Sequence, residues 1–337
     1  MNYIVTYQGS QGKFEHIKTV WLAFLGVMLL ATATLADQPT LRIELYPIQS
    51  ETLTPIQFLT AEKPGTPVTI AGELRMPFGM KGRMPAVVLV HSSGGITPQV
   101  DPWARELNKI GIVVFILDSF TGRGVGEGIV PESRVSFFTM LVDAYRTLEL
   151  LSNHPRIDPS RIAIMGFSRG GRVAMYASLK RFQRMHGPAG VEFAAYLPFY
   201  PACWTTYIGD EQVSEGRIRI FHGTADNWTP IEPCRKYVER LRKLGKDVQL
   251  IEYSGAHHAF DAPGDFIRQF PNATGLGTCE CEERPGGLVV NRATGEPWKP
   301  SDTCATKGTT IGGNPQARAK AIKIVKEFLT ETFKIEK

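Results

Sequence analysis

Basic residues never gather in this sequence: no run of five occurs, although 38 lysines and arginines against 33 acidic residues give a net charge of +5. Proteins that bind nucleic acid concentrate Lys and Arg in a patch or along one helix face. The sequence therefore predicts no nucleic-acid partner. Internal repeats and low-complexity tracts are absent as well, so a repeat array is not expected.

A run of about 20 apolar residues, the length that spans a membrane, is also missing. The longest apolar stretch, Val20–Ala31, is shorter, follows Lys13 and Lys18, and leads into small residues that end at Ala36. This order is typical of a secretory leader. We therefore predict a signal peptide at residues 1–36, export to the periplasm or the medium, and no stable membrane span after cleavage. The alternative is an uncleaved anchor helix.

Cysteines are few, and their spacing is unlike that of a zinc site. Cys203 and Cys234 each lie a little beyond a predicted strand, so they could meet at one rim of a sheet. The other three share a Gly- and Pro-rich segment, where one of them must stay unpaired or bind elsewhere: Cys279, Cys281 and Cys304. The Cys-x₂₋₄-Cys knuckle of most zinc sites is missing, which favours disulfides over a metal. No metal or organic cofactor is predicted.

Strand-like and helix-like segments alternate through most of the chain. Several strand-like runs are apolar throughout, as in strands buried on both faces. The expected strands are Leu41–Leu45, Pro67–Met76, Pro85–His91, Ile112–Leu117, Arg161–Met165, Phe193–Tyr200, Arg217–Phe221 and Val248–Tyr253. The expected helices are Trp103–Ile110, a long helix through Phe138 and Leu148, one after Gly171, Glu232–Leu244 and one at the C-terminal end. This alternation predicts an α/β domain with a mostly parallel sheet covered by helices on both faces, opening with antiparallel strands.

One segment breaks the alternation. Gly, Pro, Thr and Cys dominate residues 261–314, and no period lasts there. We predict a single domain over residues 37–337 with an insertion of loops at about 261–314, in which Leu288–Trp298 forms a small hairpin.

The most informative stretch is Gly166-Phe167-Ser168-Arg169-Gly170, which lies between a predicted strand and a predicted helix. Gly-x-Ser-x-Gly in that context is the nucleophile elbow, a sharp turn that exposes the serine hydroxyl beside a helix N-terminus. Ser168 is therefore the predicted nucleophile. The alternative is an ordinary Gly-rich turn.

Two further predicted strands end at residues that would complete a catalytic triad. Asp226 follows Arg217–Phe221, and the pair His257 and His258 follows Val248–Tyr253. The carboxyl ends of parallel strands meet at one edge of a sheet, so these side chains are expected near Ser168. A serine needs an imidazole to take its proton and a carboxylate to orient that imidazole.

Other residues at strand ends offer alternatives. Asp118 also follows a strand and is the second candidate for the acid, although it precedes the elbow. Asp226 itself could merely shape a turn or cap a helix. His91 and His222 are expected to be structural hydrogen bonders rather than bases.

Three blocks of this sequence together resemble the dienelactone hydrolase family: Gly166–Gly171, Asp226–Pro230 and Gly255–Phe260. The resemblance runs from about Pro67 to the C-terminus, apart from the insertion. It implies the α/β-hydrolase fold and hydrolysis of a small ester or lactone. The family histidine stands two residues before a Phe, which favours His258 over His257.

The family frame implies further site residues. The oxyanion hole should use the backbone N–H groups of Arg169, after the nucleophile, and Ser93, after the strand Pro85–His91. Arg123 could meet a substrate carboxylate, as a family arginine in a similar loop does, or form a surface ion pair. Three aromatic residues flank the expected site and could line an acyl pocket or belong to the core: Trp204, Trp228 and Phe260.

The sequence also departs from the founding enzymes of the family. They carry a cysteine where this chain has Ser168, and a Glu where it has Ser92. We predict a serine hydrolase of a carboxylic ester or lactone that works through an acyl-enzyme. A peptidase or acyltransferase with the same triad, or a binding protein that kept the fold without catalysis, are the alternatives. Nothing in the sequence sets the oligomeric state.

Overall fold

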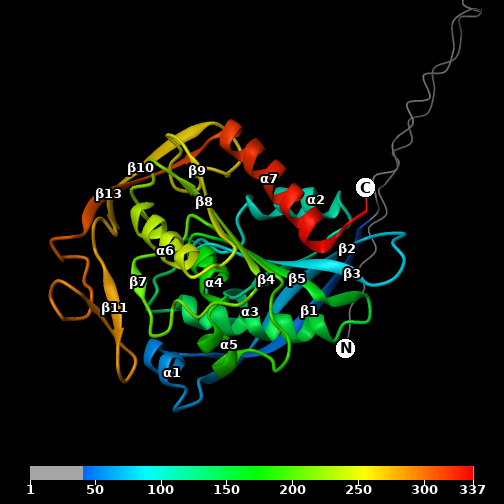
Figure 1. Cartoon of the computed structure of the whole chain (residues 1–337), viewed down its shortest axis with the longest axis horizontal. Helices are drawn as coiled ribbons and strands as arrows, with labels where there is room; N and C mark the ends of the chain where they lie inside the picture. Colours follow the sequence, from blue (N-terminus) through cyan, green and yellow to red (C-terminus); the bar gives the residue numbers. More distant parts are fainter. Residues whose placement is uncertain (1–40, 127, 337) are drawn as a thin grey trace, which may run out of the picture.

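The computed structural model describes residues 41–126 and 128–336, which form one eight-stranded sheet, two small sheets and helices on both faces of the main sheet (Figure 1). The strands of the main sheet are β1 (Leu41–Thr52), β2 (Thr66–Pro77), β3 (Met84–Val90), β4 (Val113–Asp118), β5 (Ile157–Phe167), β6 (Ala195–Phe199), β8 (Arg217–Gly223) and β9 (Val248–Tyr253). The helices are α1 (Pro55–Thr60), α2 (Val100–Asn108), α3 (Phe137–Ser152), α4 (Arg169–Tyr176), α5 (Lys180–His186), α6 (Glu232–Lys243) and α7 (Pro315–Phe333).

The main sheet has the order β1-β2-β4-β3-β5-β6-β8-β9. Strand β2 pairs antiparallel with both β1 and β4, and all later neighbours are parallel. The carboxyl ends of β5, β8 and β9 therefore lie at one edge, as the sequence predicts. The central strand β3 is buried along its whole length, which explains its unbroken apolar composition. This is the predicted α/β-hydrolase architecture.

Two apolar cores lie on opposite faces of this sheet. One contains side chains of α1, α3, α4, α5 and α6, and the other contains side chains of α2 and α7. Figure 1 shows α2 and α7 together on one side of the sheet and α3 and α5 on the other. Each predicted long helix is present, and the short helices α1 and α5 were not predicted.

The predicted loop insertion contains strands. They are β10 (Phe266–Gly275), β11 (Cys281–Arg284), β12 (Leu288–Asn291) and β13 (Thr306–Gly313), and they gather at one end of the molecule (Figure 1). Strand β10 pairs with β13, and β11 pairs with β12 and with the short β7 (Thr205–Thr206). The hairpin predicted at Leu288–Trp298 is wrong in its bounds, because Leu288 begins the second strand of a hairpin whose first strand is β11.

The described residues contain two disulfides, one between the segment after β6 and α6 and one within the insertion. Cys203 is bonded to Cys234, and Cys279 to Cys304, so four of the five cysteines form the disulfides that the sequence favours. Cys281 is a buried free thiol. Burial raises its pKa to about 11, so it carries little reactive thiolate near neutral pH.

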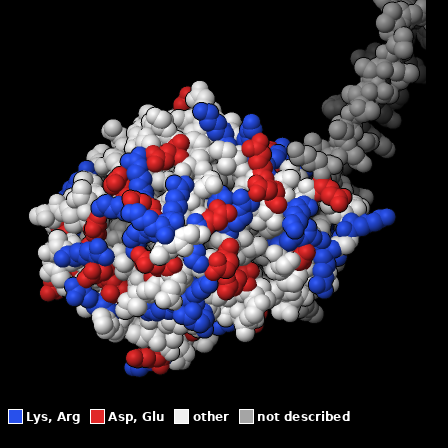
Figure 2. Space-filling model, in the orientation of Figure 1, with Lys and Arg blue, Asp and Glu red and all other residues white. Residues whose placement is uncertain are grey.

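Charges of both signs are mixed over the face drawn in Figure 2. Within residues 41–126 and 128–336, no helix has the length and apolar composition to span a bilayer. The predicted signal peptide at residues 1–36 lies outside the described residues, so its cleavage stays a prediction.

Candidate active site

Ser168 lies at the sharp turn between β5 and α4. Its φ of 54° is in the left-handed region, which few residues with a side chain adopt. The flanking glycines permit this turn because other backbone comes very close. A Cβ on Gly166 would lie 2.0 Å from the Gly170 carbonyl oxygen, and one on Gly170 would lie 2.2 Å from the Val90 carbonyl oxygen at the end of β3. The spacing Gly-x-Ser-x-Gly is thus required by packing of the elbow against the sheet.

Asp226 follows β8. Its side chain is buried, and both of its carboxylate oxygens accept hydrogen bonds. Its Oδ1 accepts from the backbone N–H groups of Trp228 and Thr229 at 2.9 and 2.8 Å, and its Oδ2 lies 3.0 Å from the Thr229 hydroxyl. Burial opposes ionisation of Asp226. Contacts with His258 and His222 and the Thr229 N–H outweigh that penalty and hold the pKa of Asp226 below its usual value. Asp226 is therefore a carboxylate at neutral pH.

His258 follows β9 and contacts both of the other residues. Its Nδ1 lies 2.7 Å from Asp226 Oδ2, and its Nε2 lies 2.9 Å from Ser168 Oγ. A carboxylate only accepts hydrogen bonds, so Nδ1 donates to Asp226 and Nε2 is left to accept from the serine hydroxyl. Such an arrangement can move a proton from the hydroxyl to the imidazole.

The alternative candidates lie elsewhere. His257 directs its Nδ1 to the carbonyl oxygen of Ala225, at 3.0 Å. Asp118 Oδ1 accepts from two backbone N–H groups of its own turn, at 2.9 and 3.0 Å. His91 is buried and accepts from the Ser119 N–H, a structural contact.

Comparisons with known proteins agree with this geometry. The family model for the dienelactone hydrolase family matches residues 70–275, which include all three contacting side chains. The chain belongs to the dienelactone hydrolase family.

Curated relatives of this family member are distant but cover most of its hydrolase core. A Synechocystis protein named a putative carboxymethylenebutenolidase is 21% identical over 212 residues, 58% of this chain and 83% of the relative. A Bradyrhizobium protein named a probable 2-oxo-3-(5-oxofuran-2-ylidene)propanoate lactonase is 25% identical over 188 residues, 53% of this chain and 74% of the relative. The chain is accordingly a hydrolase of this family.

Solved structures support the fold. A dienelactone hydrolase-like promiscuous phosphotriesterase from metagenomic libraries superposes with a TM-score of 0.53 at 16% identity, over 86% of this chain and 98% of that chain. At this identity the likeness establishes the α/β-hydrolase fold alone.

The two residues predicted to form the oxyanion hole are connected through one loop residue, Val130. The Val130 N–H donates to the Ser93 carbonyl at 2.9 Å, and the Val130 carbonyl accepts from Arg169 Nη2 at 2.5 Å. Arg169 is also the first residue of α4, so its backbone N–H has no acceptor within the helix. Its buried guanidinium further bonds the Val135 carbonyl and lies 3.2 Å from Glu132.

The structure corrects the expectation for Arg123. Its guanidinium is buried against Asp143, with nitrogen–oxygen distances of 2.7 and 2.9 Å. Its remaining donors bond Thr52 Oγ1 and the carbonyl oxygens of Ser119 and Glu51. Arg123 therefore has no donor left for a substrate carboxylate, and it holds β1, α3 and the loop after β4 together instead.

The aromatic residues predicted to line a pocket separate into three cases. Phe260 is fully buried beside Tyr253 and Phe199, so of its two alternatives the place in the core is the one observed and the place in a pocket is not. Trp228 is half-buried, and its ring centroid lies 5.5 Å from that of His258. It is the predicted aromatic that borders the site.

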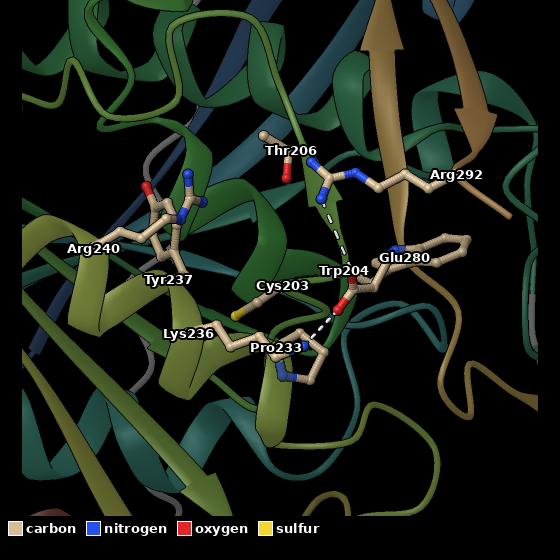
Figure 3. A pocket seen from close by; sticks show the side chains of 9 residues that line it. All are labelled: Cys203, Trp204, Thr206, Pro233, Lys236, Tyr237, Arg240, Glu280 and Arg292. Atoms are coloured by element: carbon tan, nitrogen blue, oxygen red, sulfur yellow. Dashed lines mark hydrogen bonds and ion pairs between the residues drawn. The ribbon is translucent and has the colours of Figure 1, made fainter.

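Trp204 lies at another cavity, of about 260 Å³, between α6 and the insertion (Figure 3). Its ring packs edge-on to Trp298. The residues that line this cavity are Cys203, Trp204, Thr206, Pro233, Lys236, Tyr237, Arg240, Glu280 and Arg292. None of them is Ser168, Asp226 or His258, which corrects the expectation that Trp204 lines their pocket.

Sequence reasoning missed a buried carboxylate behind His258. Asp261 is fully buried and accepts from Gln99 Nε2, Trp103 Nε1 and the Tyr200 hydroxyl at 2.6 to 2.7 Å. Burial raises the pKa of Asp261 by more than these hydrogen bonds lower it. The Tyr200 ring in turn packs edge-on to His258 at 4.7 Å. Asp261 thus fixes the loop that carries the imidazole.

Sequence reasoning also missed the β10–β13 ribbon. The Gly312 N–H donates to the His258 carbonyl at 2.9 Å, and the Thr310 N–H donates to Asn227 Oδ1 at 2.8 Å. The Phe270 ring lies 5.6 Å from that of Trp228. The ribbon therefore contacts both the loop after β8 and the loop after β9.

Proposed function

We propose that this protein hydrolyses a small carboxylic ester or lactone, with Ser168 as nucleophile, His258 as general base and acid, and Asp226 as the group that orients His258. Ser168 Oγ attacks the carbonyl carbon while His258 Nε2 takes the hydroxyl proton. His258 then gives that proton to the leaving alkoxide, which departs as the alcohol. Water, deprotonated by His258, attacks the acyl-enzyme and releases the acid.

The oxyanion formed in both steps needs donors that are already in position. We assign them to the backbone N–H groups of Ser93 and Arg169, two residues that follow the carboxyl ends of β3 and β5. Val130, bonded to both residues, would hold the two donors at a fixed separation.

The contact of 2.9 Å between Ser168 Oγ and His258 Nε2 carries this proposal. A serine held at a φ of 54° has a conformational cost that a structural turn would avoid by using glycine. Strain at the residue whose hydroxyl meets the free Nε2 of a buried His–Asp pair favours a catalytic role over a structural one.

Labelling with a fluorophosphonate tests the nucleophile directly. The phosphorus should bond Ser168 Oγ with loss of fluoride, one label per chain, because an activated hydroxyl is required. Peptide mapping should find the label on Ser168 and on no other serine. Absence of label from protein whose circular dichroism shows it folded would favour a binding protein over an enzyme.

We propose that the preferred ester or lactone substrate carries an uncharged acyl group. Arg123, the cation that the sequence offered for a carboxylate, is occupied by Asp143. An aromatic side chain, Trp228, borders His258 and is itself backed by Phe270. Apolar surfaces of this kind favour neutral groups.

Arg169 provides a test of the oxyanion-hole assignment. Arg169→Met keeps the backbone N–H but removes the side-chain bonds to Val130 and Val135, so the donor should lose its fixed position. We expect kcat for a p-nitrophenyl ester to fall about 10- to 100-fold, less than the ~10²–10³ typical of a deleted donor, with KM changed little.

Arg172→Met is the matched control for Arg169. Arg172 pairs with the same Glu132 at 3.0 Å and stacks on Phe137, but the structure gives it no bond to Val130. Its kcat should stay within about threefold of the parent. Equal losses in both variants would count against the role of Val130 and point to a general disturbance of the loop.

We further propose that the chain is exported and that its mature form is one domain over residues 37–337. Two disulfides support this localisation, because such bonds persist outside the reducing cytosol. The predicted leader at residues 1–36 supports it independently.

A further inference from the structure

Strand β1 forms one edge of the main sheet. In the part of the chain that the structure describes, β2 is its only partner, over the whole of Leu41–Thr52. A long unpaired edge is a template for another strand, and natural proteins usually shorten or cover such edges. Here the edge is twelve residues long.

The positions of three prolines show which backbone groups face outward. Pro47 stands opposite Ala71, Pro67 opposite Glu51, and Pro77 opposite Leu41. Proline has no N–H, so it occupies positions of the ladder that make no hydrogen bond. The odd-numbered residues of β1 therefore direct their N–H and C=O groups away from β2, toward the free edge.

The same odd-numbered residues carry apolar side chains that the described chain leaves partly exposed. Leu41, Ile43 and Leu45 are 37%, 39% and 53% exposed. Toward the end of β1 the even-numbered Ile48 and Ser50 are buried on the face that α3 covers, so the odd-numbered side chains lie on the opposite face. Phe78, which follows the partner of Leu41, is 68% exposed.

We propose that the β1 strands of two copies of this chain pair antiparallel about a two-fold axis at Ile43. In that register Ile43 meets Ile43, and Leu41 meets Leu45 of the second copy, all on one face. On the other face Arg42 meets Glu44 of the second copy, and the symmetry repeats the pair. The segment Leu-Arg-Ile-Glu-Leu is complementary to itself in this register and in no neighbouring one.

The exchange of charge partners needs little rearrangement. In the single chain Arg42 lies 2.5 Å from Glu44, with the arginine side chain 53% exposed and the carboxylate 13% exposed. Rotation of the mobile arginine side chain is sufficient to reach the carboxylate of the second copy. Tyr46 also bonds Glu44 and keeps that carboxylate in place.

The interface lies apart from the proposed catalytic residues. Strands β2, β4 and β3 separate β1 from β5, which carries Ser168. Dimerisation therefore leaves the site open, and the proposal stands whether or not the catalytic assignment does. The short segment predicts a weak dimer, with a dissociation constant on the order of 10 µM.

Sedimentation velocity of the purified protein from about 1 to 200 µM tests this. We expect the mass to rise from one chain toward two over that range. Ile43→Lys places two ammonium groups on the axis and should keep the protein monomeric throughout. The same change on α7, Ile322→Lys, is the control and should still dimerise.

Charge reversal tests the register. Arg42→Glu and Glu44→Arg each set like charges opposite one another twice, so each should weaken self-association about tenfold or more. An equimolar mixture of the two variants restores both pairs and should dimerise like the parent, as should the double variant. Circular dichroism of each variant monitors folding.

Three results would overturn the proposal. One is a parent protein that stays monomeric at every concentration, which is also the outcome if the edge binds a strand of a different protein. Another is a dimer that Ile43→Lys leaves intact. The third is a mixture of the charge variants that associates no better than either alone.

Discussion

Replacing Ser168 by alanine should lower kcat/KM for a p-nitrophenyl ester about 10⁴-fold or more, because the bond-forming oxygen is lost and the imidazole has no proton to accept. Stopped-flow assays with the parent should also give a burst of p-nitrophenolate equal to one per chain, which the variant lacks. The structure gives the reason: Ser168 Oγ is the atom that His258 Nε2 contacts.

Ser92→Ala is the matched control for Ser168. Ser92 lies in the turn after β3, and its hydroxyl accepts from the Gly94 N–H at 3.2 Å, so its loss should cost less than about tenfold in rate. A rate in Ser168→Ala that matches the parent would remove the acyl-enzyme mechanism. If the burst is lost but turnover is retained, then either the nucleophile or the deacylation step has been misassigned.

The second large effect is expected at Asp226. Asp226→Asn keeps the size of the side chain but can donate toward His258 Nδ1, which favours the wrong tautomer and leaves the imidazolium without a counter-charge. We expect kcat to fall about 10³- to 10⁴-fold at neutral pH, with little change in KM. Steady-state kinetics measured over a range of pH would report this.

Asp118→Asn tests whether Asp226 or Asp118 is the acid that orients the histidine, since both lie at the carboxyl end of a strand. Asp118 caps its own turn through backbone N–H groups of Phe120 and Thr121, so its replacement should change stability slightly and rate less than about tenfold. A larger loss of rate at Asp118 than at Asp226 would contradict the choice of acid.

The sheet and the convergence at its edge could be predicted from the sequence because both depend on local patterns. Apolar runs such as that of β3 mark strands buried on both faces, and parallel strands bring their carboxyl ends together. The elbow glycines fix the place of Ser168 within this frame. The expected contacts of Ser168 with one histidine of the pair His257 and His258, and of that histidine with Asp226, follow from these rules and from chain order, whereas the choice of His258 came from the family resemblance.

The β10–β13 ribbon could not be predicted because its stability comes from elsewhere. Strand β10 contains Pro271 and a register shift, and β13 is rich in Thr and Gly, so neither has a regular apolar alternation. The ribbon is held by bonds to the loops of Asn227 and His258, which are distant in sequence. The strand propensity of the local sequence gives no information about such long-range contacts.

Arg123 and Asp261 show the same limit for single charged residues. Each stands in a Gly-rich or Pro-rich loop that the sequence presents as solvent-exposed. Arg123 is buried because Asp143 on α3 faces it, and Asp261 because Trp103 and Tyr200 donate to it. A charge is buried only where partners meet it, and those partners come from other elements.

The attachment of β13 to the loops of the acid and the base has a consequence for the order in which the site forms during folding. All three proposed catalytic residues precede Thr306–Gly313 in the chain, yet the Gly312 N–H and the Thr310 N–H help to hold the loops of the base and the acid. A nascent chain, or a fragment cut near Gly275, would carry the complete set of reactive groups without their supports. Turnover should therefore begin only after β13 has packed against those loops, which would keep an incompletely folded hydrolase inactive.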